Sequence, residues 1–182
     1  AWEVGNELGG NWLGSDAVEK TTIAAQRVRE MGKTTLLTIY YQLGQDDEAH
    51  STFTWIEQNL DSGLKDLVDV VGLSIYPQQH PLGTAADRVM SAFEKAFPGK
   101  KVAVTELSYG GADLDGAPWW FGSATDLRQA RRAVAEHLTS VGLGRVKSWG
   151  APFWWYYLED ETPGAAGGPV SDVLAEVAAR GA

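Results

Sequence analysis

Hydrophobic and β-branched residues fall into five short runs along the chain, and most of these runs show no strict alternation with polar residues. Runs of this kind are typical of strands that are covered on both faces of a sheet. The pattern therefore predicts five strands, at Trp2 to Asn6, Thr34 to Tyr41, Val68 to Tyr76, Lys101 to Thr105 and Ala151 to Tyr157.

Between these runs, hydrophobic residues recur with the 3.6-residue period of a helix, and turn residues mark the helix ends. A first helix follows Asp16, which forms a predicted capping box with Glu19, and Gly32 ends it. Another helix is capped by Thr84 and ends before Pro98. The remaining helices are predicted at Thr52 to Asn59, Thr125 to Val141 and Ser171 to Arg180.

The strands and helices alternate, which is typical of a parallel sheet with helices packed outside it. A doubly wound sheet and an incomplete (β/α)8 barrel both fit. A doubly wound nucleotide-binding sheet has a G-x-G-x-x-G turn after its first strand, and the first loop here, LGGNWLG, lacks that spacing. Because a barrel averages about 31 residues per unit, five units come close to the length of 182 residues. We therefore expect one α/β domain over residues 1–182, of the (β/α)8 TIM-barrel type, with about five units and without the first three.

The composition narrows the class of partner. Lys and Arg total 15 against 24 Asp and Glu, and the formal charge of −9 argues against nucleic acid, which needs a basic surface. No apolar run approaches the roughly 20 residues that span a bilayer, so no membrane partner is expected. The chain has no cysteine, and its three histidines show no ligand spacing, so neither a metal nor another cofactor is expected.

Two glutamates stand directly at the ends of predicted strands. Glu7 follows WEVGN, and Glu106 follows KVAVT, although glutamate has a low strand propensity. The active site of a barrel lies at the carboxyl ends of its strands, so the two side chains are expected to face one another there. Such a pair suits glycoside cleavage, in which one carboxyl protonates the leaving oxygen and the other attacks the sugar or activates water.

Four short motifs occur in chain order: WEVGNE, GLSIYP, VAVTELSYG and APFWWYYLED. Together they resemble strands four, six, seven and eight of the clan A glycoside hydrolases, retaining (β/α)8 enzymes such as the family 5 cellulases and mannanases and the family 53 endo-galactanases. The resemblance covers essentially the whole chain. It implies a retaining O-glycoside hydrolase of poly- or oligosaccharides, in which Glu7 is the acid/base and Glu106 the nucleophile.

The resemblance also implies roles for the neighbours of the pair. Asn6 would hold the sugar 2-hydroxyl, and Tyr76 would hydrogen-bond Glu106. Glu7 would have a raised pKa and stay protonated, while Glu106 would stay ionised.

Aromatic residues at strand ends and in loops would bind the sugar rings. The floor under the cleaved sugar would be Trp155, with Trp154 as the alternative. The stretch 113–120, DLDGAPWW, is the best candidate for setting substrate preference. Further rings would stack on Trp12, Trp119 and Trp120.

The family barrel has three further strands ahead of these motifs, which leaves three explanations open. The chain is a C-terminal fragment of a longer enzyme, or it pairs with the missing N-terminal half or a second chain, or it is a shortened relative that binds carbohydrate without cleaving it. The substrate class implies secretion, because polysaccharides usually lie outside the cell.

Overall fold

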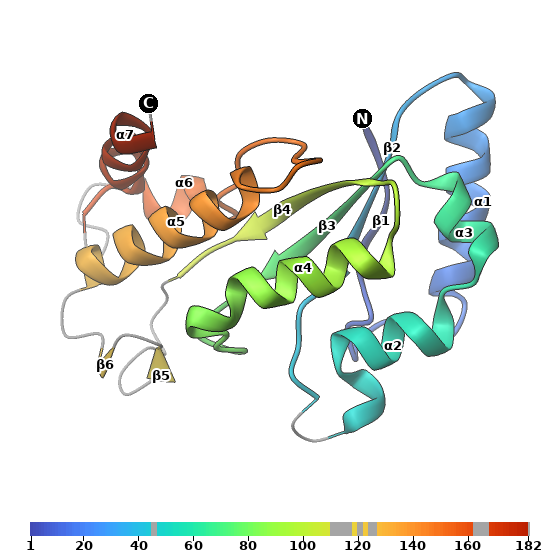
Figure 1. Cartoon of the computed structure of the whole chain (residues 1–182), viewed down its shortest axis with the longest axis horizontal. Coiled ribbons are helices and arrows are strands. Elements are labelled where there is room, and N and C mark those ends of the chain that lie inside the picture. The colour runs from blue at the N-terminus through green and yellow to red at the C-terminus, as the bar shows by residue number, and fades with distance from the viewer. Residues whose placement is uncertain (45–46, 110–117, 120–121, 124–126, 162–167, 182) are drawn as a thin grey trace.

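A parallel sheet of four strands forms the centre of the computed structural model, which describes residues 1–44, 47–109, 118–119, 122–123, 127–161 and 168–181. The order in the sheet follows the chain, and each strand is joined to the next through helices (Figure 1). The four described strands therefore lack the reversal of order found in a doubly wound sheet, and they are compatible with part of an α/β barrel. The strands are β1 (Trp2–Leu8), β2 (Thr35–Tyr40), β3 (Val70–Ile75) and β4 (Lys101–Leu107).

Helices flank this sheet. In Figure 1, α4 (Ala86–Ala96) lies in front of the sheet, with α1 (Ala17–Glu30) on one side and α5 (Leu127–Leu143) on the other. No helix in the described ranges combines the length and the hydrophobicity that crossing a membrane requires. The other elements are η1 (Glu48–His50), α2 (Thr52–Asn59), α3 (Ser62–Leu67), η2 (Gly83–Ala85), the antiparallel pair β5 (Pro118–Trp119) and β6 (Gly122–Ser123), α6 (Tyr157–Asp160) and α7 (Val170–Gly181).

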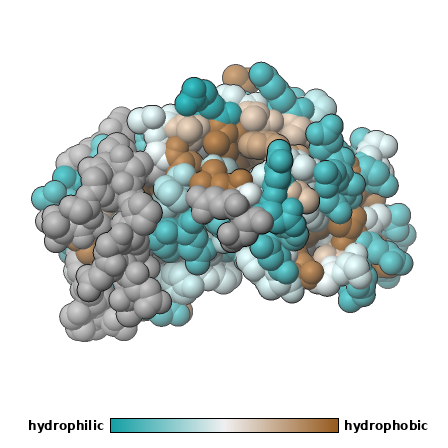
Figure 2. All heavy atoms as spheres, turned by 90° about the horizontal axis from the view of Figure 1, so that it is seen from below, coloured by the Kyte–Doolittle hydropathy of each residue, from teal (hydrophilic) through white to brown (hydrophobic). Residues whose placement is uncertain are grey.

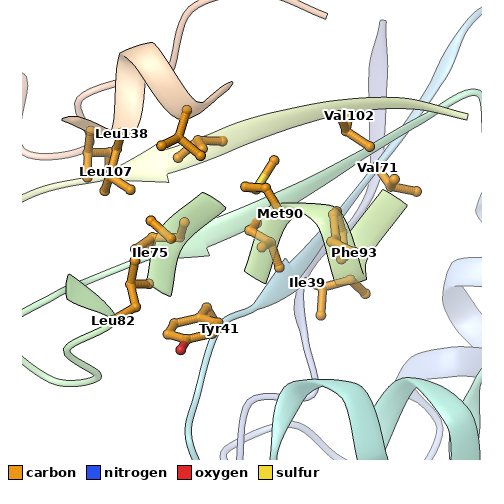
Figure 3. Packing of buried hydrophobic residues seen from close by; sticks show 14 of the residues in the cluster. Ile39, Tyr41, Val71, Ile75, Leu82, Met90, Phe93, Val102, Leu107 and Leu138 are labelled. Carbon is orange, nitrogen blue, oxygen red and sulfur yellow. The ribbon is translucent and has the colours of Figure 1, made fainter. Parts of the chain in front are cut away.

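The two sides of the sheet differ in chemistry. On the helix side, Val71 and Ile75 of β3 belong to one buried hydrophobic cluster with Met90 and Phe93 of α4 (Figure 3). The opposite side, called the inner face below, carries small and polar residues that contact one another: Thr38, Gly72, Ser74, Thr105 and Glu106. The helix side therefore supplies the hydrophobic free energy of the fold, and the inner face is left for other chemistry.

Gly72 makes the contacts of the inner face possible. The hydroxyl oxygens of Thr38 and Thr105 hydrogen-bond over 3.0 Å, although β3 lies between their strands. The Thr38 hydroxyl also hydrogen-bonds the Glu3 carboxylate. A Cβ atom on Gly72 would lie 2.2 Å from Cγ2 of Thr105, so any side chain at position 72 would displace Thr105.

Four of the five predicted strands are present, and their ends differ from the predicted ends by no more than two residues. The fifth prediction, a strand from Ala151 to Tyr157, is wrong. Within it, only Trp154 forms a parallel bridge to β4, a second isolated bridge lies before it at Ser148, and Tyr157 begins α6. Gly150, at φ 147°, and Pro152, which has no N–H group to donate, interrupt the ladder between the two bridges.

The predicted helices are all present, but their predicted caps differ. Within the described residues, Asp16 makes no capping hydrogen bond and instead forms an exposed ion pair with Lys20 at 3.0 Å. Thr84 does not cap α4, because it lies inside η2. The short helix α3 was not predicted, and its signal is Asp61, whose carboxylate accepts from the backbone N–H of Leu64 at 3.0 Å.

A buried ion pair ties the segment after α5 to the sheet. The Arg131 side chain of α5 is 3% exposed, and its Nη2 lies 2.5 Å from Oδ1 of Asp160. Arg131 Nε also donates to the carbonyl of Tyr109, just beyond β4, at 2.9 Å. The second oxygen of Asp160 accepts from the indole N–H of Trp154 at 2.7 Å. One carboxylate therefore holds α5, α6 and Trp154 together.

We expect Asp160→Ala to lower the free energy of unfolding by about 3–5 kcal/mol, because it leaves the Arg131 guanidinium buried without its carboxylate. Urea unfolding at neutral pH, followed by tryptophan fluorescence, measures the change. Glu176→Ala is the matched control, since Glu176 pairs with Arg128 and Arg132 at the surface, and its loss should be much smaller. Equal losses in the two variants would contradict a structural role for the buried pair.

Candidate active site

A cleft of about 390 Å³ lies at the ends of the strands. Its volume falls within the range of roughly 300–1,000 Å³ that small-molecule sites occupy. Figure 2 shows the molecule from below, and hydrophobic and hydrophilic residues are interspersed on that face. The residues that line the cleft are Glu7, Trp12, Tyr40, Tyr76, Gln78, Gln79, His80, Glu106, Trp155 and Tyr156.

The backbone of β1 is irregular where it carries Glu7. The pairing register with β2 shifts twice, between Glu3 and Gly5 and between Gly5 and Leu8. Glu7 has φ 50°, the one positive value of a non-glycine residue in the described part of the chain. Left-handed backbone is uncommon for such residues, and it occurs preferentially where a site requires a particular side-chain direction.

A second irregularity sets the direction of Glu106. Leu73 of β3 pairs with Val104, and Ser74 pairs with Glu106, so Thr105 is an extra residue in β4. A β-bulge of this kind re-aims the following side chain. As a result, both Thr105 and Glu106 contact residues of the inner face, and Glu106 is only 4% exposed.

The hydroxyl of Ser74 lies between the two carboxyl groups. Its oxygen is 2.5 Å from Oε1 of Glu7 and 3.4 Å from Oε2 of Glu106. These two oxygens of the pair are therefore at most about 5.9 Å apart, the sum of the two distances. An upper limit of this size for one pair of oxygens is closer to the roughly 5–5.5 Å between the carboxyl groups of retaining glycosidases than to the roughly 6.5–9.5 Å of inverting ones.

Burial and charge raise the pKa of Glu106 to about 7, from an ordinary value of 4.5. Loss of hydration is the largest cause, and the charge of Glu7 adds to it. Tyr76 acts in the opposite direction, because its hydroxyl donates to Oε2 of Glu106 at 2.6 Å and so favours the ionised form. Burial of the phenol, together with the same contact, raises the pKa of Tyr76 far above its usual range.

The sequence predicted an ionised Glu106, whereas burial and the neighbouring charge raise the pKa of its carboxyl to about 7. The prediction was wrong because it counted the hydrogen bond from Tyr76 and left out the burial produced by the bulge of β4.

The structure brings some of the predicted binding residues to the cleft and not others. Tyr76, Trp12 and Trp155 line it together with the two glutamates. Trp154 is buried with its indole on Asp160, and Asn6 is exposed on β1 outside the lining of the described cleft. Trp119 lies in β5, and Trp120 and most of the stretch 113–120 fall outside the described residues.

Sequence reasoning missed Ser74, which contacts both carboxyl groups. A signal was available, since Ser74 stands two residues before Tyr76 and alternate residues of a strand share one face. Gln78 and Gln79 also line the cleft, and nothing in the sequence distinguishes them from ordinary loop residues. In the described part of the chain, no group of three or more potential ligands gathers to hold a metal ion.

Comparison with known proteins adds no relative: no family model matches this chain, and no curated protein matches it. The chemistry of the site is therefore interpreted from its geometry.

The raised pKa of Glu106 makes stability depend on pH in a defined direction. Between about pH 4.5 and 7 the folded protein binds a proton on Glu106 that the unfolded chain has released, so the unfolding free energy falls as pH rises. We expect this fall to be larger in the native protein than in Glu106→Gln by about 3 kcal/mol.

Urea unfolding at steps between pH 4 and 8.5 tests this expectation. Glu57→Gln, which changes an exposed carboxyl on α2, is the control and should follow the native curve. Parallel curves for the native protein and Glu106→Gln would show that the Glu106 pKa is not raised.

Proposed function

We propose that the protein is a retaining O-glycoside hydrolase of poly- or oligosaccharides. In this proposal the four strands and the segment 148–154 correspond to strands four to eight of a (β/α)8 barrel. The observation that carries the proposal is the pair of carboxyl groups at the ends of β1 and β4, the first and last strands of the parallel sheet. One oxygen of each lies within hydrogen-bonding distance of the same hydroxyl, and these two oxygens are at most about 5.9 Å apart.

In the first step, Glu7 gives its proton to the glycosidic oxygen while an oxygen of Glu106 attacks the anomeric carbon. The bond from that carbon to the glycosidic oxygen breaks, and the leaving sugar departs as an alcohol. A covalent glycosyl ester of Glu106 remains. The hydroxyl of Tyr76 stabilises the Glu106 carboxylate before attack, because it donates to Oε2.

In the second step, Glu7 acts as a base. Its carboxylate takes a proton from water, the water oxygen attacks the anomeric carbon, and the ester bond to Glu106 breaks. Both carboxyls return to their starting states, and the product has the configuration of the substrate. Ser74 supports this exchange of charge, because its hydroxyl is within reach of both carboxyls and can donate to whichever is ionised.

Substrates with different leaving groups distinguish the roles of the two glutamates. Glycosyl fluorides need little protonation to react, whereas alkyl glycosides and disaccharides need an acid. We expect Glu7→Gln to lower kcat/KM, which reports the first step, by roughly 10²–10⁴-fold for disaccharides and much less for fluorides. Glu106→Gln should abolish turnover of both.

Fluoride release and reducing-sugar assays on glucosyl, galactosyl, mannosyl and xylosyl substrates measure these effects, and NMR of the first product gives its configuration. An inverted product would contradict the mechanism. If the native protein binds these sugars and hydrolyses none of them, it is a carbohydrate-binding protein and not an enzyme.

The Tyr76 contact makes a further prediction about pH. The first step needs one proton on the carboxyl pair, because Glu7 donates a proton while Glu106 attacks as a carboxylate. We therefore expect kcat/KM to fall as pH rises through about 7, where the pair loses that proton. Tyr76→Phe removes the donor that favours the ionised form, so we expect this fall to move to higher pH. A pH profile that is lower at every pH but unshifted would mean that Tyr76 does not act on Glu106.

A further inference from the structure

The side of the cleft next to Glu7 is built by residues that the catalytic steps above do not use. These are Trp12, Tyr40, Gln79 and His80, called the aromatic wall below. We infer that the aromatic wall binds the sugar ring that leaves with the glycosidic oxygen, and that this ring is uncharged. The inference rests on the proposed function and adds to it the class of leaving group.

The members of the aromatic wall hold one another in place. The rings of Trp12 and Tyr40 meet edge to face with centroids 4.8 Å apart, and those of Tyr40 and His80 do so at 5.5 Å. The hydroxyl of Tyr40 donates to Oε1 of Gln79 at 2.7 Å. Trp12 stays 60% exposed although it lines the cleft, so a large part of its ring is free for a ligand.

The backbone fixes Trp12 relative to Glu7. The N–H of Gly10 donates to the carbonyl of Glu7 at 3.0 Å, and the N–H of Leu13 donates to the carbonyl of Gly10 at 3.1 Å. The indole lies against Gly10, where a Cβ atom would be 2.5 Å from Cζ2 of Trp12. Because Glu7 protonates the leaving oxygen, a ring held against Trp12 is placed on the leaving-group side.

The sheet order separates the two ends of the cleft. The aromatic wall comes from the loops and strands of β1, β2 and β3, whereas Trp155 follows the segment that bridges to β4, beyond Glu106. A substrate that spans both glutamates therefore has its anomeric sugar towards Trp155 and its leaving sugar towards Trp12.

Two polar atoms in or next to the aromatic wall lack hydrogen-bond partners among the described residues. Nδ1 of His80 and Oε1 of the adjacent Gln78 are shielded from solvent and have no hydrogen-bond partner among the described residues. A buried polar atom without a hydrogen-bond partner destabilises a protein, unless water or a ligand supplies that partner. Both side chains line the cleft, so hydroxyl groups of a sugar can donate to these atoms once the side chains turn towards it, and an aryl or alkyl leaving group has none to offer.

Charge narrows the ligand further. The residues described as lining the cleft include two glutamates and neither lysine nor arginine. A uronic acid or a sulfated sugar would face these carboxyls without a cation to balance it, so a neutral sugar is favoured.

The test compares two substrates of one sugar: its glycosyl fluoride, whose leaving group has no ring, and its disaccharide. The sugar is the one of glucose, galactose, mannose or xylose whose fluoride the native protein hydrolyses fastest. We expect Trp12→Ala and Gly10→Ala each to lower the ratio of kcat/KM for disaccharide over fluoride at least about 10-fold. Gly14→Ala is the matched control, because a Cβ at Gly14 would lie 3.7 Å from Oδ1 of Asp16, an ordinary contact, and its ratio should equal the native one.

The outcomes separate the inference from the proposed function. The inference is wrong, and the proposed function stands, if the fluoride is hydrolysed and the kcat/KM ratios of Trp12→Ala and Gly10→Ala equal the native ratio. The same holds if the native protein prefers a disaccharide whose leaving group is a uronic acid to one whose leaving group is neutral. If no fluoride is hydrolysed, the proposed function fails. Calorimetry with the four disaccharides then tests whether the aromatic wall binds a sugar at all. Binding that Trp12→Ala abolishes would then support the wall as a sugar site, and binding that it leaves unchanged would overturn it.

Discussion

The close approach of two carboxyl groups around the Ser74 hydroxyl is unfavourable in free energy, and the rest of the structure has to compensate for it. Ser74 brings an oxygen of Glu7 and one of Glu106 within about 5.9 Å of each other, in a place where Glu106 has lost nearly all contact with water. Two like charges at that distance repel, and loss of hydration adds to the cost. The site can persist because the helix side of the same strands carries a large buried hydrophobic cluster, which includes Ile39 on β2 and Leu107 on β4.

The sheet reaches this arrangement by departing from regular geometry at both carboxylates. A left-handed backbone at Glu7 and an extra residue at Thr105 each turn a glutamate into the same space. In a regular ladder, residues alternate between the two faces, and Thr105 and Glu106 would point in opposite directions. The irregular backbone and the unfavourable charges are thus two parts of one feature.

The sequence predicts most of the fold because its signals are local. Apolar runs place β1 to β4 within two residues of their ends, and α2 has the predicted bounds. The carboxylates could be found because they stand directly after those runs. Two features of the site could not be predicted, because they depend on residues far away in the sequence. The bulge at Thr105 forms only against β3, and the raised pKa of Glu106 follows from the burial that the bulge creates. The predicted last strand failed for a local reason that was visible, the Gly150 directly before it and the Pro152 within it.

The missing side chain of Gly72 limits how this site can evolve. Thr105 occupies the space that a Cβ at position 72 would need, and Thr105 is the residue whose insertion turns Glu106 inward. A substitution at Gly72 would therefore reach the carboxylate through a neighbour, without touching it. Random libraries built on β3 would disturb the carboxyl pair at a position with no chemistry of its own, so the tolerance of a residue to mutation is here a poor guide to its distance from the site.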